Sequence, residues 1–164
     1  DRPDFFNLRY KKPQPFVARH LRAEVPGRID FLGKELIPLD LTHLNEILDN
    51  FKKYQVQAIA VCLIHSYANS FHEEKVIEQI KKNWPEVNTV ASHQITREWR
   101  EYERANTTVL CSYIKPIAKN YLDKLNSKLN ESKFKGNPYV MQSNGGIDTF
   151  EATKIIPLTM FSNL

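Results

Sequence analysis

The sequence contains no apolar run that approaches the about 20 residues needed to form a membrane-spanning helix. Its first residues also lack the charged, apolar and small-residue layout of a signal peptide. Neither low-complexity tracts nor internal repeats are present. These absences favour a soluble, cytoplasmic protein with no membrane segment.

Cysteine is also scarce, and no CxxC pair is present. The two cysteines, Cys62 and Cys111, therefore read as small core residues in a reducing compartment. The alternative, a reactive thiol, needs a basic or helix-N-terminal setting. The pair His72-Glu73 resembles the start of a zinc-binding helix, but Val76 stands where the second ligand belongs. We expect no metal site.

Motifs of autonomous enzymes are missing as well: GxSxG, a Walker loop and GxGxxG do not occur. The net charge of +4 is spread along the chain, with basic and acidic residues alternating, so nucleic-acid binding is not expected. What the 164 residues do offer is the length and apolar content of an ordinary globular domain.

The first half of the chain alternates between strand and helix patterns. Short apolar pieces between residues 16 and 40 predict a hairpin that turns near residues 32–34. A helix capped by Asp40 or Thr42 should follow. The continuous apolar run 56–64 is typical of a strand buried on both faces of a parallel sheet.

The same alternation continues in the second half. Ser70 and Glu73 are spaced as a capping box for a helix that should end before Pro85. Residues 87–95 and 139–142 predict two further strands. The order of elements predicts an α/β fold, with a partly parallel sheet flanked by helices.

One long helix should span residues 97–131. Its apolar residues recur every three or four positions, which predicts a core-facing stripe. The members of this stripe are Leu110, Ile114, Ile117, Tyr121, Leu125 and Leu129. Pro116 lies inside the pattern and should bend or divide the helix, because it lacks an N–H group and crowds the preceding turn.

Polar residues near predicted strand ends are the candidates for chemistry. Glu101, Glu103 and Arg104 form a charged block, which is either a helix first turn with ordinary ion pairs or a cluster facing a cleft. His65 follows a buried strand, where open α/β sheets place ligands, although a polar residue satisfied at the strand end is the simpler interpretation.

A glycine pair suggests a further site. The loop Ser143-Asn144-Gly145-Gly146 precedes a short helix, with Asp148 as candidate cap and Glu151 three residues later. Such a strand-to-helix turn can aim N–H groups at a phosphate, but a tight turn explains the glycines equally well. The apolar residues 157–164 resemble the start of another strand.

Three segments together resemble the hydantoinase A/oxoprolinase family. They are AIAVCLIHSYANSFHEEKV (58–76), REYERANTTVLCSYIKP (100–116) and YVMQSNGGIDTFEA (139–152). The similarity begins at about Arg19 and includes RAEVPGRID and GKELIPLD. The EYER run followed by Thr107-Thr108 is more similar to the N-methylhydantoinase A and acetone carboxylase beta-subunit branch than to 5-oxoprolinases.

The resemblance implies a lobe of an actin-like, sugar-kinase-like ATPase that uses ATP and Mg²⁺ to activate a carbonyl oxygen. The implied function is a fragment of an ATP-dependent hydantoinase that opens a cyclic imide or amide, often with a second subunit of hydantoinase B type. Two alternatives remain open: a fragment of the ATP-binding subunit of a ketone carboxylase, and a non-catalytic scaffold with the same fold.

The resemblance also carries residues and boundaries. Residues 143–146 match the family's SNGG loop and are expected at the nucleotide, while Glu101, Glu103 and Arg104 match EYER. Arg22 and Arg28 match arginines of unassigned role. No GGTFTD-like phosphate loop is present, and only Ser162 matches the loop SGPAGG. We therefore expect residues 1–136 to be the later part of the N-terminal region, residues 137–164 to begin the main domain, and the piece alone to be inactive.

Overall fold

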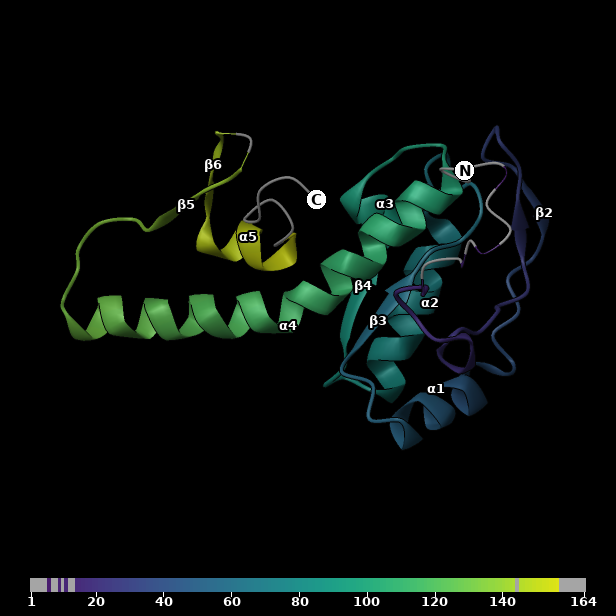
Figure 1. The fold of residues 1–164 in the computed structure, drawn as a ribbon, viewed down its shortest axis with the longest axis horizontal. Helices are drawn as coiled ribbons and strands as arrows, with labels where there is room; N and C mark the ends of the chain where they lie inside the picture. The colour runs from purple at the N-terminus through teal and green to yellow at the C-terminus, as the bar shows by residue number, and fades with distance from the viewer. Residues whose placement is uncertain (1–5, 7–8, 10, 12–13, 144, 157–164) are drawn as a thin grey trace.

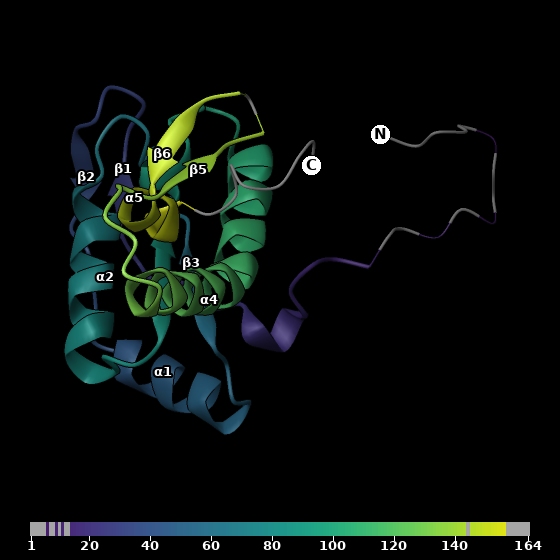
Figure 2. The same cartoon turned by 90° about the vertical axis from the view of Figure 1, so that its left-hand side faces the viewer.

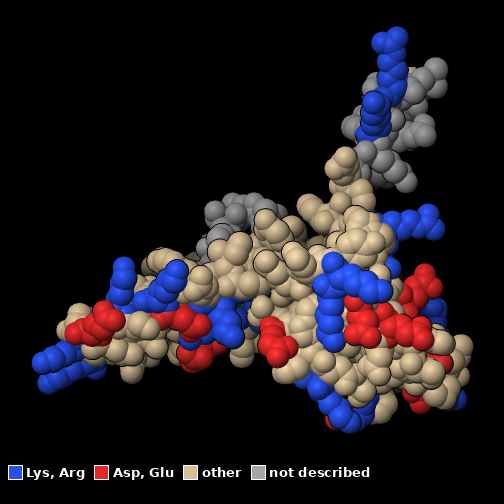
Figure 3. All heavy atoms as spheres, turned by 90° about the horizontal axis from the view of Figure 1, so that it is seen from below, with Lys and Arg blue, Asp and Glu red and all other residues tan. Residues whose placement is uncertain are grey.

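The computed structural model describes residues 6, 9, 11, 14–143 and 145–156. Figure 1 shows two parts: an α/β body, and an arm made of the outer half of helix α4 (Glu101–Glu131) with a small hairpin and helix beside it. Basic and acidic side chains are interspersed along the face drawn in Figure 3. No helix among the described residues combines the length and apolarity that crossing a bilayer requires.

Two parallel strands form the centre of the body. β3 (Ala58–Val61) pairs in register with β4 (Asn88–Ala91), which confirms the parallel pairing expected for the apolar run. Ile59 and Val61 lie two residues apart and therefore face the same side of the sheet, where both are buried. The α/β class with a partly parallel sheet is confirmed.

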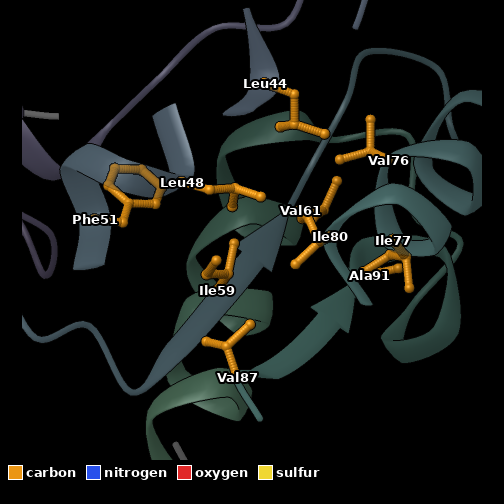
Figure 4. Packing of buried hydrophobic residues seen from close by; sticks show 10 residues of the cluster. All are labelled: Leu44, Leu48, Phe51, Ile59, Val61, Val76, Ile77, Ile80, Val87 and Ala91. Carbon is orange, nitrogen blue, oxygen red and sulfur yellow. The ribbon is translucent and has the colours of Figure 1, made fainter. Parts of the chain in front are cut away.

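The core lies between the parallel strands and two helices, α1 (Leu44–Lys53) and α2 (Phe71–Asn83). Figure 4 shows hydrophobic side chains from these four elements, and from Val87 just before β4, converging on one cluster. The buried members of the cluster are Leu44, Leu48, Phe51, Ile59, Val61, Val76, Ile77, Ile80, Val87 and Ala91. Helix α2 ends before Pro85, as predicted.

An antiparallel hairpin precedes the core. β1 (Arg28–Ile29) pairs with β2 (Glu35–Ile37), and the chain turns between them as predicted. The Asp30 carboxylate stabilises this turn by accepting hydrogen bonds from the main-chain N–H groups of Leu32 (2.9 Å) and Lys34 (2.8 Å). A short 3₁₀ turn, η1 (Arg19–Leu21), lies upstream.

The side-chain caps predicted for α1 and α2 are both wrong. Helix α1 begins after His43, and Asp40 instead accepts two hydrogen bonds from Thr42, which lower the pKa of the Asp40 carboxyl group. At the start of α2, Ser70 donates to Glu74 (2.6 Å). Glu73 is turned into the interior and is fully buried, so it cannot reach back to close a capping box.

Helix α4 is continuous through Pro116, but it changes direction midway along its length (Figures 1 and 2). Proline cannot donate its i→i−4 hydrogen bond, which explains a bend without a break. Near the bend, the Lys115 ammonium group donates to the main-chain oxygen of Thr89 on β4 (3.1 Å). Burial lowers the pKa of Lys115.

The face that α4 buries differs from the predicted stripe. Ile117 and Tyr121 are 62% and 58% exposed, whereas their neighbours Ala118 and Leu122 are buried. The buried residues are Arg104, Thr108, Cys111, Ser112, Ala118 and Leu122. Periodicity shows which residues share a face of the helix. The face that packs against β3 and β4 is the one whose small side chains allow close approach.

Two predicted strands also end differently. β4 stops at Ala91, and residues Ser92–Ile95 form a helical turn, α3, rather than continued strand. β5 (Tyr139–Met141) pairs antiparallel with β6 (Ile147–Thr149), so it does not join the parallel sheet. Helix α5 (Phe150–Ile155) follows. The strand expected within 157–164 lies outside the described residues.

Replacing Leu48 with alanine tests the core. Leu48 is 1% exposed, so Leu48→Ala should lower the free energy of unfolding by about 2–5 kcal/mol, because it removes buried apolar contacts and leaves a cavity. Leu36→Ala is a matched control, since Leu36 is 56% exposed and its loss should cost less than about 1 kcal/mol. Urea denaturation measures both, and equal losses would contradict this core.

Candidate functional site

Buried polar residues gather at the carboxyl ends of β3 and β4. Because the strands are parallel, both ends meet at one edge of the sheet, the place where open α/β sheets bind ligands. The chain leaves β3 through residues 62–67 and leaves β4 through α3. Glu73 from α2 and Arg104 from α4 reach this edge, and both residues are 0% exposed.

The Glu73 carboxylate is the centre of the cluster. One oxygen accepts from the main-chain N–H of Leu63 (2.8 Å) and the Ser92 hydroxyl (2.6 Å). The other oxygen lies 3.1 Å from the main-chain nitrogen of His93 and 2.7 Å from its Nδ1. The Ser92 and Ser66 hydroxyls are also 3.0 Å apart. Glu73 thereby ties α2 to the ends of both parallel strands.

Arg104 holds the neighbouring main chain. Its guanidinium donates to the main-chain oxygens of Leu63 (2.7 Å) and Glu98 (3.1 Å), and it lies 5.6 Å from the centre of the Tyr67 ring. Its Nε has no acceptor among the described residues. Arg104 is therefore a buried side chain that binds two main-chain carbonyl groups. Because it points into the interior, it supports the structural interpretation of the EYER block.

The acids of that block point the other way. Glu101 and Glu103 are exposed, and Glu103 lies 3.8 Å from Arg100 in an exposed ion pair. Trp99 and Tyr102 beside them are 68% and 77% exposed. The structure thus separates the candidates: Arg104 joins the buried cluster and the two glutamates do not. Any catalytic role for these residues stays a prediction.

His65 lies in the segment that leaves β3, near Arg104. Its Nδ1 is 3.2 Å from the Tyr67 hydroxyl, and its ring meets the Tyr67 ring edge-on. Its φ of 58° is rare for a residue other than glycine, so the surrounding contacts must hold this conformation. His65 and Arg104 are brought together through Tyr67, while the role predicted for His65 stays a prediction.

The loop 143–146 lies elsewhere, at the tip of the β5–β6 hairpin on the arm (Figure 1). The predicted strand-to-helix turn is wrong. Gly145 has φ +82° and donates its N–H to the main-chain oxygen of Gln142 (3.0 Å). Asn144 lies outside the described residues, and Ser143 and Gly146 are exposed. Nucleotide binding by this loop stays a prediction.

The cap of α5 also differs from the prediction. The Thr149 hydroxyl, rather than Asp148, accepts from the main-chain N–H of Ala152 (3.2 Å). Helix α5 therefore begins beyond β6 and not directly after the glycine pair. A helix N-terminus aimed at a phosphate in this loop is not part of the described structure.

A pocket of about 270 Å³ lies against the segment that leaves β3. Its walls include Cys62, Leu63 and Ile64, residues of the hairpin region, and His72. The His72 Nε2 lies 2.6 Å from Glu35, which links α2 to β2. Cys62 is half-buried at this pocket, whereas Cys111 is fully buried as predicted.

Glycine at position 27 permits this close packing. A Cβ atom at Gly27 would lie 3.2 Å from the His72 ring, and Gly27 has φ +153°. Both the contact and the backbone conformation favour glycine there.

The sequence patterns missed several residues of the cluster. Ser92 and His93 have neither motif nor periodicity to mark them. Ser66 lies within the segment 58–76 that carries the family resemblance, and Glu73 was expected at a helix cap. The one available signal was position: polar residues directly after a buried strand. No group of three or more His, Cys, Asp or Glu side chains in the described part of the chain could hold a metal ion.

Comparison with known proteins shows which family this chain matches. Residues 1–84 match the hydantoinase/oxoprolinase N-terminal region, and residues 104–163 match the hydantoinase/oxoprolinase domain. The division at residue 136 stays a prediction. An uncharacterized protein of Methanocaldococcus jannaschii is 39% identical over 150 residues, which are 92% of this chain and 22% of that protein.

Solved structures agree with the sequence matches. The crystal structure of ATP-dependent caprolactamase from Pseudomonas jessenii matches 87% of this chain with a TM-score of 0.78 and 31% identity. A nucleotide-free acetone carboxylase structure matches 93% of it with a TM-score of 0.79 and 27% identity. The acetone carboxylase beta subunit of Xanthobacter autotrophicus is 28% identical over 145 residues. The chain spans about a fifth of these relatives, 20% and 22% of the two solved chains.

Glu73→Gln tests the centre of the cluster. A glutamine keeps the shape but removes the charge and presents an NH₂ group to neighbouring donors, so the variant should lose about 2–4 kcal/mol of stability. Glu74→Gln is the control, because the Glu74 side chain is 58% exposed and its change should cost less than about 0.5 kcal/mol. Chemical denaturation compares the two; a loss no larger for Glu73→Gln would refute the assignment.

Proposed function

Because the chain belongs to the hydantoinase/oxoprolinase family, we propose that it is part of an ATP-dependent enzyme that opens a cyclic amide or imide by hydrolysis. The observation that carries this proposal is the match to ATP-dependent caprolactamase over 87% of the chain. Two further relatives, 5-oxoprolinases of Arabidopsis thaliana and Saccharomyces cerevisiae, point to the same class of enzyme. We expect a hydantoin-like ring as substrate.

The low reactivity of an amide carbonyl explains why the proposed reaction uses ATP. An amide carbonyl is a poor electrophile, and a phosphoryl group placed on its oxygen makes the carbon easier to attack by water. ATP, with Mg²⁺, would supply that group when bound. The protein then has to hold the carbonyl oxygen in line with the phosphoryl group of ATP and to limit the direct hydrolysis of ATP by water.

Nucleotide binding at loop 143–146 remains a proposal. The N–H of Gly145 is already used within the hairpin, and α5 has six residues and begins after β6. We therefore assign no step of ATP chemistry to loop 143–146. In this proposal the chain contributes a rigid edge of one lobe, where Glu73 and Arg104 fix the ends of the parallel strands.

A second candidate function is a ketone carboxylase. The acetophenone carboxylase gamma subunit of Aromatoleum aromaticum is 31% identical over 140 residues, and the match to acetone carboxylase is as good in backbone as the match to caprolactamase. Both reactions begin at a carbonyl oxygen.

A partner subunit is also part of the proposal. Since these carboxylase relatives and the caprolactamase alpha chain are subunits of larger enzymes, we propose that this protein works with a second subunit of hydantoinase B type. We propose the cytoplasm as its location.

The substrate class can be tested on a chain of the relatives' length that contains these residues, together with its partner subunit. We expect Mg-ATP to bind in calorimetry and phosphate release to rise when hydantoin or ε-caprolactam is added. Stimulation by acetone with bicarbonate instead would favour the carboxylase. A chain that binds no nucleotide would refute both enzymes and leave a scaffold.

The 164 residues alone should behave differently. We expect no ATP hydrolysis above a mock preparation, because these residues contain no GGTFTD-like loop and match the SGPAGG loop only at Ser162. Phosphate release measured with and without hydantoin checks this. Turnover that follows the purified chain through two columns would contradict it.

A further inference from the structure

We propose that Glu73 and Arg104 act as one coupled pair of positioning residues, joined through the main chain of Leu63. The N–H of Leu63 donates to Glu73 (2.8 Å), and the carbonyl oxygen of the same residue accepts from Arg104 (2.7 Å). The two side chains carry opposite charges, come from α2 and α4, and are both 0% exposed. Leu63 is therefore held by a buried anion on one polar group and a buried cation on the other.

Charge compensation is the first argument for coupling. A buried charge is costly unless an opposite charge or a full set of hydrogen bonds offsets it. No carboxylate lies within ion-pair distance of Arg104 in the described ranges, where its acceptors are two main-chain oxygens and its Nε has none. Glu73, on the other polar group of Leu63, is the anion placed to offset this cation.

The second argument is the segment that the pair holds. Leu63 lies between Cys62 and Ile64, and all three line the pocket of about 270 Å³. Arg104 also lies over the Tyr67 ring, so its contacts extend along the segment 62–67. The positive φ of His65 within it shows a conformation that needs outside support. The pair thus fixes the wall of the pocket.

This geometry predicts that losing either partner damages the same element. Without Arg104, the Leu63 oxygen keeps only the longer hydrogen bond from the Ser66 N–H (3.4 Å), and the Glu73 charge loses the cation on the other polar group of Leu63. Without the Glu73 charge, the cation is left in the interior with neutral acceptors. Losing both leaves neutral groups, so the double loss should cost much less than the two single losses together.

A double-mutant cycle measures this coupling in the 164-residue chain. The variants are Glu73→Gln, Arg104→Met and the two combined, each followed by urea denaturation. We expect the double variant's effect on the unfolding equilibrium constant to be at least about tenfold smaller than the product of the single effects. Multiplicative effects would overturn the proposal.

A local probe separates positioning from general stability. In a Cys111→Ala background, Cys62 is the remaining thiol and lies in the pocket wall. Glu73→Gln and Arg104→Met should each raise the rate of Cys62 alkylation by iodoacetamide about tenfold under native conditions, because the segment opens locally.

Leu122→Ala is the control for that probe. Leu122 is 0% exposed but lies in the half of α4 beyond Pro116, so its loss lowers stability without touching the segment 62–67. We expect it to change the alkylation rate by less than about twofold. An equal rise in this control, or no rise in the two test variants, would overturn the proposal.

The probe also remains usable if one test variant fails to fold, because the other single variant then decides it against the same control. Neither measurement involves ATP, hydantoin or a partner subunit. A negative result would therefore leave the proposed enzymatic function standing, and a failed activity assay would leave the coupled pair standing.

Discussion

The buried carboxylate of Glu73 is the interaction on which the α/β body depends. A charge with no exposure to water persists only where donors replace its hydration, and here they come from the segment after β3 and from α3. Because these segments follow β3 and β4, the carboxylate fixes both strand ends to α2. Arg104 adds the fourth element by holding the Leu63 oxygen from α4. This edge of the sheet is thus built by side chains remote in sequence.

The arm is held together by contacts between α4 and α5. Beyond the bend at Pro116, α4 leaves the strands and packs with α5, where Thr153 and Phe150 are buried (Figure 2). The Lys154 ammonium group bridges the two helices by lying 2.7 Å from Asp123 and 2.7 Å from Glu151, and these hydrogen bonds raise the pKa of Lys154. The hairpin tip with the glycine pair is carried on this arm, apart from the Glu73 cluster. The two candidate sites therefore belong to different parts of the chain.

This separation bears on function. The family match covers both parts, since one region of similarity ends at residue 84 and the other begins at 104. The break between them falls in the stretch that contains β4, α3 and the exposed Trp99. The two solved relatives are about five times as long as this chain and contain further residues outside the matched region. The chain belongs to the hydantoinase/oxoprolinase family, whose members similar to it include a caprolactamase, 5-oxoprolinases and ketone carboxylases.

The sequence by itself determined the local elements and the family. Helix α2 and its end before Pro85, the hairpin at residues 30–34, the parallel strand after residue 56 and the motifs around SNGG and EYER all depend on neighbours along the chain. Only the tertiary structure decided which face of α4 is buried, that β5 pairs away from the parallel sheet, and that Glu73 enters the core instead of capping α2. The reason is physical. Propensity and periodicity act over a few residues, whereas burial and hydrogen-bond satisfaction are settled by partners such as Leu63 and Arg104, which meet across 41 positions.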